Sequence, residues 1–303
     1  MRFGTMEQSF PVWGRFAVEM AGEAGFQGIQ ITDGGGYLQP HPLNNGFVEY
    51  ERFGLDLRRK DSFPLTDRRV QEDYLEAAEA AGVRLTGIYL YLLDHQGFMK
   101  FSDRTPQGHQ CLETIQNAVL AAEQMRIPLV TVPCRGLFGV GQHAYALEKL
   151  RYAARLGEDR GVRIAAAMDA GLERQIEVLE RLDGKVTLDH GVLDPALYAY
   201  GRAPEVIRLL GRERLAQIRM RDLQADEEGL LASSTMRPAQ LGQGIGLSDC
   251  AEAVLDTGFD GWILSETPYY SAALAEDGGD FPTMVRRDLK ALRQLFSGKE
   301  GRN

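Results

Sequence analysis

Titratable side chains follow several short apolar segments of this sequence, where they could do acid–base chemistry. In KVTLDHGVLD, residues 185–194, Asp189 and His190 come at the end of an apolar run. Such groups at the end of a buried strand cost free energy unless they are paired, hydrated or in contact with a ligand. We expect a functional role for Asp189; the alternative is that it caps the next helix. For His190 we predict substrate contact, and the alternative is a hydrogen-bonded structural histidine.

The ends of the other apolar segments supply further candidates. They are Asp33, Asp94, His95, Arg135, Asp169, Arg219, Asp222 and Glu266. A carboxylate can move a proton, and a guanidinium can hold an enolate, a phosphate or a carboxylate through paired hydrogen bonds. We predict that His95, Arg135, His190 and Asp222 bind substrate, with surface or structural roles as the alternative. Asp94 could fix the tautomer of the neighbouring His95 imidazole.

A recurring pattern predicts the elements that carry these residues. It consists of an amphipathic helix, a glycine and a short apolar strand. The pattern appears in EMAGEAGFQGIQIT, LEAAEAAGVRLTGIYLY, ARLGEDRGVRIAAA and EAVLDTGFDGWILS. Glycine suits the left-handed position that ends a helix, and a strand that is apolar on both faces suits a sheet covered by helices.

Strict alternation of strand and helix predicts the fold class. Counting from RFGTM, the sequence holds eight strands, including LVTVP, KVTLD and AQIRM. Eight β–α units predict a single-domain α/β protein, a (β/α)₈ barrel over residues 1–297 with a frayed tail at 298–303; an open doubly wound sheet is the alternative. The long segments 33–66, 94–105 and 222–247 all follow strands, on the face where barrel sites form.

Composition excludes some classes of partner. The chain has 303 residues and a net charge of −9, which disfavours a phosphate backbone, so we expect no nucleic-acid partner. Three scattered cysteines fit a reducing compartment, and no apolar stretch is long enough to span a membrane. We therefore expect a cytoplasmic protein with a small-molecule substrate and no membrane partner, and a homo-oligomer is an open option.

The C-terminal third resembles a known family. The stretch LGQGIGLSDCAEAVLDTGFDGWILSE, residues 241–266, is similar to the C-terminal signature of xylose isomerase-like barrels, the sugar (phosphate) isomerase and epimerase group. VTLDHG resembles the sixth-strand Asp motif of that family, and IRMRD resembles its seventh-strand motif. The resemblance implies a (β/α)₈ barrel and proton transfer beside a substrate carbonyl, with a divalent metal that polarises the carbonyl.

The resemblance also implies a ligand set, which this chain matches only in part. The family holds its metal with a Glu, an Asp, a His and a second Glu from strands five to eight. Asp189 and Glu266 match the Asp and the last Glu, whereas Ala167 or Met168 stands at the fifth-strand position and Arg219 replaces the His. Arg has no acceptor atom and stays charged, so it cannot be a metal ligand.

Two interpretations of this altered set stay open. In the first, one divalent ion (Mn²⁺, Mg²⁺, Zn²⁺ or Co²⁺) is held by Asp189 and Glu266, with Asp169 in place of the missing Glu. In the second, Arg219 supplies the positive charge, either to an oxyanion or by neutralising the two carboxylates in an inactive site. The catalytic candidates are Glu266, Asp189 and Arg219.

The expected function is isomerisation or epimerisation of a small polyhydroxylated carbonyl compound through an enediolate. Dehydration on the same scaffold is a close alternative, and a non-catalytic member that binds a sugar or supports a partner is another. GVGQHA, residues 139–144, starts too far past its strand to be a dinucleotide loop, so we expect no nucleotide cofactor. Five scattered histidines do not supply the metal cluster of a related endonuclease.

Overall fold

The computed structural model describes most of the chain. The described residues are 1–33, 63–134, 136–138, 143–192, 203–224, 237–244, 246–271, 274 and 280–297, without the side chains of Leu92, His95, Gln96, His143, Gln224 and Arg237. The predicted tail at 298–303 and the greater part of the long segment 33–66 lie outside these residues.

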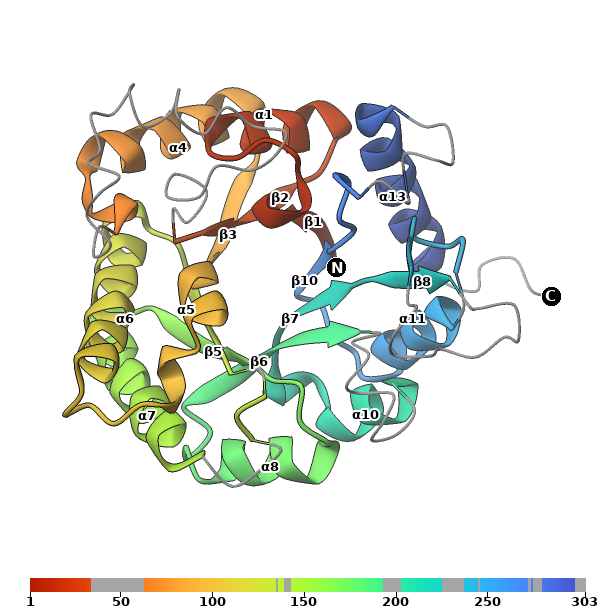
Figure 1. Ribbon diagram of the computed structural model, residues 1–303. Coiled ribbons are helices and arrows are strands. Elements are labelled where there is room, and N and C mark those ends of the chain that lie inside the picture. The colour runs from red at the N-terminus through yellow and green to blue at the C-terminus, as the bar shows by residue number, and fades with distance from the viewer. Residues whose placement is uncertain are drawn as a thin grey trace.

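Eight parallel strands close into a barrel, as the alternation predicts (Figure 1). They are β1 (Arg2–Met6), β2 (Gly28–Thr32), β3 (Arg84–Tyr89), β4 (Leu129–Pro133), β5 (Arg163–Ala167), β6 (Val186–Val192), β7 (Leu215–Met220) and β10 (Trp262–Ser265). Each strand pairs with its neighbours along the chain, and β10 closes the ring on β1 with Phe3 opposite Ile263. All eight predicted strand segments therefore lie in one barrel, and the open sheet is excluded.

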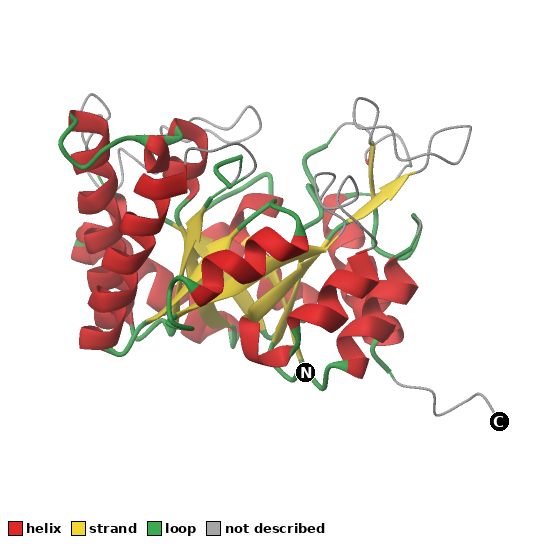
Figure 2. Ribbon diagram, turned by 90° about the horizontal axis from the view of Figure 1, so that it is seen from below, coloured by secondary structure: helices red, strands yellow, loops and turns green. Residues whose placement is uncertain are grey.

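Helices form an outer layer around the strands (Figure 2). The α-helices in the described ranges are α1 (Arg15–Ala24), α4 (Arg68–Ala81), α5 (Tyr91–Gln96), α6 (Pro106–Met125), α7 (His143–Arg160), α8 (Leu172–Glu180), α10 (Ala203–Leu210), α11 (Leu247–Asp256) and α13 (Phe281–Leu295). Short 3₁₀ turns are η1 (Glu7–Ser9), η2 (Pro64–Thr66), η3 (Phe98–Lys100) and η4 (Arg212–Arg214). None of these helices is long and apolar enough to cross a membrane.

Local sequence explains where the helices begin and end. Asp67 caps α4 by accepting a hydrogen bond from the Arg69 backbone N–H, as its position before the helix predicts. Gly25 and Gly82 end α1 and α4 in the left-handed conformation, with φ of 89° and 65°. This conformation favours glycine because a Cβ would crowd the following carbonyl. The helix–glycine–strand pattern thus sets the spacing of the barrel.

One feature of the fold is absent from the sequence-based expectation. Within the long segment after β7, the strands β8 (Asp222–Gln224) and β9 (Arg237–Ala239) form a two-stranded antiparallel sheet outside the barrel. β7 ends at Met220 and β8 begins at Asp222, so the chain leaves the barrel at Arg221.

Candidate functional site

Three of the predicted catalytic residues meet at one end of the barrel. The Arg219 Nε lies 2.8 Å from Asp189 Oδ1, and the Arg219 Nη1 lies 2.7 Å from Glu266 Oε1. All three residues are at most 5% exposed. The guanidinium also lies 5.8 Å from the centre of the Tyr89 ring, a distance that allows a cation–π contact. One arginine therefore stands between the two carboxylates and forms an ion pair with each.

Asp189 is buried inside the barrel rather than placed at its rim. β6 continues to Val192, three residues past the strand end that the sequence suggested. The other carboxylate oxygen, Oδ2, accepts hydrogen bonds from Gln30 Nε2 at 3.1 Å, Thr131 Oγ1 at 2.8 Å and Gln217 Nε2 at 2.8 Å. These partners come from β2, β4 and β7, so Asp189 ties the inner faces of several strands together and directs Arg219.

The predicted metal set is not assembled. Asp169 instead accepts the Gly136 backbone N–H with both carboxylate oxygens, at 2.8 and 3.0 Å. In the part of the chain that the structure describes, no three His, Cys, Asp or Glu side chains are grouped to hold a metal ion. The Arg219 guanidinium stands where an ion bridging Asp189 and Glu266 would sit. Because a permanent cation with no acceptor atom repels a divalent ion, these residues do not fit a metal.

A cavity of about 200 Å³ opens beside Glu266. It is lined by Gln8, Ser9, Tyr91, Asp94, Arg221, Glu266, Pro268 and Tyr270. These residues follow β1, β3, β7 and β10, at the carboxyl ends of the strands. In (β/α)₈ barrels, active sites form on this face. We call this cavity the mouth pocket. Arg219 and Asp189 are not among its lining residues.

Arg221 is a site residue that the sequence analysis missed. Its Nη2 lies 3.0 Å from Glu266 Oε1, and its side chain is 28% exposed, whereas that of Arg219 is 3% exposed. Side chains two residues apart on a strand share a face, so the motif Gln217–Arg219–Arg221 in AQIRMRD could have revealed it. The second arginine brings a positive charge to the pocket surface.

Several polar atoms of the mouth pocket have their hydrogen-bonding capacity unused. Arg221 Nε, Ser9 Oγ and Gln8 Oε1 are buried and have no hydrogen-bond partner within the described residues. A buried polar atom without a partner costs on the order of 1–3 kcal/mol. The residues that carry these atoms all line the mouth pocket.

Tyrosine rings form the apolar part of the same pocket. Tyr91 packs edge-on against Trp13, with ring centres 5.2 Å apart. Burial raises the pKa of Tyr91 and Tyr270, and nearby negative charges, Asp94 for Tyr91 and Glu266 for Tyr270, act in the same direction. Both tyrosines therefore present neutral hydroxyl groups beside flat apolar faces, an arrangement suited to a sugar-like ring.

The remaining predicted substrate-binding residues lie away from the mouth pocket or outside the described residues. His190 is buried, and by strand alternation it faces the opposite side of β6 from Asp189. Burial and the charge of Arg219 lower its pKa to about 4, so its ring is neutral at pH 7. Asp222 is buried and accepts the backbone N–H groups of Gly242 and Gly244 at 2.8 and 2.9 Å, which fixes that loop. Arg135 and the His95 side chain are outside the described residues.

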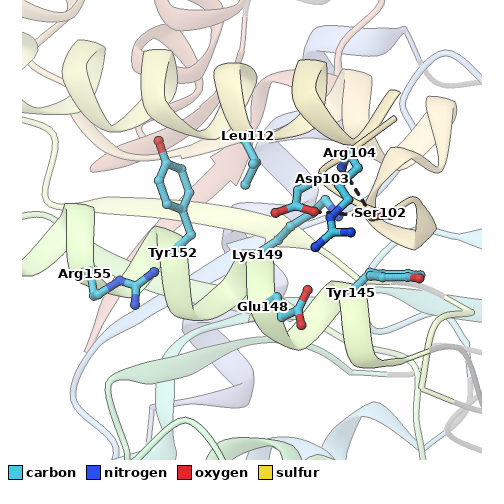
Figure 3. A pocket seen from close by; sticks show the side chains of 9 residues that line it. All are labelled: Ser102, Asp103, Arg104, Leu112, Tyr145, Glu148, Lys149, Tyr152 and Arg155. Atoms are coloured by element: carbon cyan, nitrogen blue, oxygen red, sulfur yellow. Dashed lines mark hydrogen bonds between the residues drawn. The ribbon is translucent and has the colours of Figure 1, made fainter. Parts of the chain in front are cut away.

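A larger groove of about 630 Å³ lies in the helix layer, between α6 and α7 (Figure 3). It is lined by Ser102, Asp103, Arg104, Leu112, Tyr145, Glu148, Lys149, Tyr152 and Arg155. Its most buried polar side chain, Lys149, donates a hydrogen bond to the Phe101 carbonyl, so the ammonium joins α7 to the segment before α6. Since none of the barrel's strand ends reaches this groove, we take the mouth pocket as the candidate active site.

Comparisons with known proteins agree with this fold. No curated protein sequence matches the chain. Three similar solved structures show the fold. An IOLI protein with a bound zinc atom is 14% identical, with 98% of each chain covered and a TM-score of 0.69. A D-allulose 3-epimerase from Methylomonas sp. is 13% identical, covering 97% and 98%, with a TM-score of 0.65. A 3-keto-D-glucoside 4-epimerase from E. coli is 15% identical, covering 97% and 99%, with a TM-score of 0.65.

The family assignment follows from a match over most of the chain. A family model described as xylose isomerase-like TIM barrel covers residues 18–295, which includes seven of the eight barrel strands and every residue that joins Arg219 to its two carboxylates. The signature in residues 241–266 lies inside this range and ends at Glu266, the carboxylate that lines the mouth pocket. The chain therefore belongs to the xylose isomerase-like TIM barrel family.

Proposed function

We propose that the mouth pocket binds a small polyhydroxylated carbonyl compound and that Glu266 moves a proton at the carbon beside the carbonyl. The observation that carries this proposal is the Glu266–Arg221 ion pair at 3.0 Å, both members of which line one pocket at the barrel mouth. A carboxylate base next to a guanidinium is the minimal set for enolate chemistry, because the base takes the proton and the cation stabilises the developing oxyanion.

The size and lining of the pocket support this class of substrate. Its volume of about 200 Å³ is below the range of roughly 300–1,000 Å³ for pockets that hold drug-sized ligands. Gln8, Ser9 and Arg221 line the pocket with polar side chains that suit hydroxyl groups, and Tyr91 and Tyr270 line it with aromatic rings. A small polyol with a carbonyl group uses all of these features.

In the proposed mechanism, Arg221 binds the substrate carbonyl oxygen and Glu266 removes the adjacent proton. The electron pair of the broken C–H bond forms the enediolate double bond, and the carbonyl oxygen becomes an oxyanion beside Arg221. Return of the proton to the former carbonyl carbon, with the hydroxyl proton passing to the oxyanion, completes an isomerisation. Delivery of a proton to the original carbon from its opposite face completes an epimerisation. In a dehydration, the enolate electrons would instead expel a neighbouring hydroxyl, which leaves as water after taking the proton held by Glu266.

Arg219 acts behind the pocket rather than on the substrate. Its hydrogen bonds to Asp189 and Glu266 fix the orientation of the Glu266 carboxylate, and Asp189 in turn holds Arg219. We therefore treat Arg219 and Asp189 as positioning residues and route no step through a metal ion. Similar structures that include two sugar epimerases support this type of chemistry, although at 13% and 15% identity the likeness shows only the fold.

Hydrogen–deuterium exchange tests the proposal. The protein is incubated in D₂O with a panel of ketohexoses, aldoses and keto-glycosides, and NMR follows the signal of the proton beside each carbonyl. We expect exchange with at least one compound, and a loss of about 10²-fold or more in Glu266→Gln, the usual contribution of a positioned acid–base group. Glu123→Gln, which alters an exposed ion pair with Arg160 on the helix layer, is the matched control.

The alternative is a non-catalytic member of the fold that binds a sugar or supports a partner subunit. The Asp189 carboxylate accepts four side-chain hydrogen bonds, and one of the donors, Arg219, also contacts Glu266. A site whose charged groups are already paired with one another favours this non-catalytic alternative. Full exchange activity in Glu266→Gln with every compound that wild type exchanges would exclude the proposed mechanism. A thermal shift with a sugar from the panel, without exchange in any compound, would support the binding protein instead.

A further inference from the structure

A second carboxylate, Asp94, lines the mouth pocket together with the proposed base. Asp94 lies on α5, which follows β3, whereas Glu266 follows β10. In the barrel β1 and β2 separate β10 from β3, so the two carboxylates enter the pocket from different sectors of the ring. We propose that Asp94 is the second proton-transfer residue and that the reaction is epimerisation with inversion at the carbon beside the carbonyl. This inference rests on the proposed function.

A buried tyrosine, Tyr89, holds the Asp94 carboxylate in position. The Tyr89 hydroxyl donates a hydrogen bond to Asp94 Oδ2 at 2.9 Å. Tyr89 is 1% exposed, and its ring lies under the Arg219 guanidinium that also holds Glu266. The same buried unit of Tyr89 and Arg219 therefore sets the positions of both carboxylates, as a two-base site requires.

The pocket surface between the carboxylates is continuous. Tyr91 is close enough to Asp94 and to Tyr270 for their charges to raise its pKa, and Tyr270 is close enough to Glu266 for the same effect. A substrate ring in this pocket would lie among the two tyrosines and the two carboxylates, which all line it. Glu266 alone can return a proton only to the face from which it took it, so the second carboxylate is the feature that points to inversion.

Each proton and electron pair is accounted for in the proposed step. The Glu266 carboxylate takes the proton from one face, and the C–H pair becomes the enediolate double bond with the oxyanion held at Arg221. Asp94, which takes up a proton from solvent before this step, then gives that proton to the opposite face as the electron pair returns to the same carbon. The product is the epimer, Glu266 is protonated and Asp94 is ionised; the reverse reaction uses the two groups in exchanged roles.

Isotope exchange from each epimer separately tests the assignment. For a ketohexose and its epimer at the reacting carbon, chosen from the compounds that wild type exchanges in D₂O, we expect Asp94→Asn to lose about 10²-fold or more of inversion. Exchange without inversion should persist from the epimer that Glu266 deprotonates and should disappear from the other. In Glu266→Gln, exchange should disappear from the epimer that Glu266 deprotonates and persist from the epimer that Asp94 deprotonates.

Two further variants keep the result interpretable. Asp103→Asn, on the segment before α6 and away from the mouth pocket, should retain wild-type inversion. Tyr89→Phe keeps the ring under Arg219 and removes the hydrogen bond to Asp94, so it should lower inversion while retaining exchange from the Glu266 side. Thermal unfolding of each variant reports whether it is folded.

The outcomes separate this inference from the proposed function. If wild type exchanges no compound of the panel, the proposed function fails and this inference fails with it. If wild type inverts a substrate and Asp94→Asn inverts it within a few-fold of wild type, or loses exchange equally from both epimers, the assignment of Asp94 is overturned while the role of Glu266 stands.

Discussion

Asp189 and Glu266 are 0% and 5% exposed, and each directs a carboxylate oxygen at Arg219. A buried charge is tolerated when it is paired and its remaining lone pairs accept hydrogen bonds. Asp189 meets this condition with its contacts to Gln30, Thr131 and Gln217. At the scale of single residues, the site is therefore an arginine-centred charge cluster with Arg221 as its exposed member.

Two buried titratable residues, His190 and Asp288, are expected to make opposite contributions to the pH dependence of folding stability. The pKa of His190 is lowered from 6.5 to about 4 by burial and by the charge of Arg219. The unfolded chain therefore binds a proton that the folded chain does not, and stability falls as pH drops from about 6.5 to about 4. Burial raises the pKa of Asp288 from 3.8 to about 6, so its contribution increases as pH drops through the same window.

Urea unfolding between pH 4.5 and 7 measures these contributions. As pH falls across the window, the free energy of unfolding of His190→Gln should rise relative to that of wild type by on the order of 3 kcal/mol. That of Asp288→Asn should fall relative to wild type by a similar amount. The quantity compared is the slope with pH, which is independent of any constant cost of the substitution. Equal slopes for wild type and His190→Gln would mean that the imidazole is not held neutral by the fold.

At the scale of elements, the segment that follows β7 connects the site to the outer layer. Arg221 precedes Asp222, and the buried Asp222 carboxylate accepts the N–H groups of Gly242 and Gly244. A Cβ added at Gly244 would lie 2.2 Å from Asp222 Oδ1 and 2.3 Å from the Leu223 carbonyl oxygen. The loop can stay in contact with Asp222 only while position 244 is glycine.

Gly244→Ala is therefore expected to displace this loop. Overpacking of this kind costs about 1–3 kcal/mol, and the displacement of Asp222 should also lower isotope exchange through its neighbour Arg221. Gly87→Ala is the control, because the nearest atoms to its new Cβ would be 3.4 Å away. Chemical denaturation and the exchange assay measure the two effects; a Gly244→Ala protein with the stability and activity of Gly87→Ala would contradict the role given to Asp222.

At the scale of the whole molecule, the barrel places Arg219 behind the mouth pocket, between carboxylates from β6 and from the end of β10. A divalent ion there would face a fixed cation. We expect dialysis against EDTA to leave the Tm and the isotope exchange of wild type unchanged, and added Mn²⁺ or Zn²⁺ to give no saturable rise in Tm.

Arg219→Ala supplies the comparison for the metal experiment. Removal of the guanidinium leaves Asp189 and Glu266 without their shared cation, so a divalent ion should stabilise this variant more than it stabilises wild type. Stoichiometric metal in purified wild type, together with a loss of exchange after EDTA treatment, would contradict the charge assignment made for Arg219.

The periodic apolar pattern of the sequence and its helix-capping and turn residues determine most of the fold. The eight strand segments, the Asp67 cap and the glycines that end α1 and α4 can be identified from local residue patterns, because capping and left-handed turns depend on neighbours in the chain. Parallel strand order then brings their carboxyl ends to one face. The sequence also identified Asp189, Arg219 and Glu266 as members of one site, which the structure brings together.

Tertiary structure alone decided how these residues divide their roles. β6 extends past Asp189 and buries it, whereas β7 ends so that Arg221 reaches the pocket, and sequence patterns leave strand ends uncertain by a few residues. Glu7, which accepts hydrogen bonds from Thr32 and Tyr74, looks like a surface residue in MRFGTMEQSF but is fully buried. Contacts of this kind join residues far apart in the chain, so they depend on barrel closure and side-chain packing rather than on any local pattern.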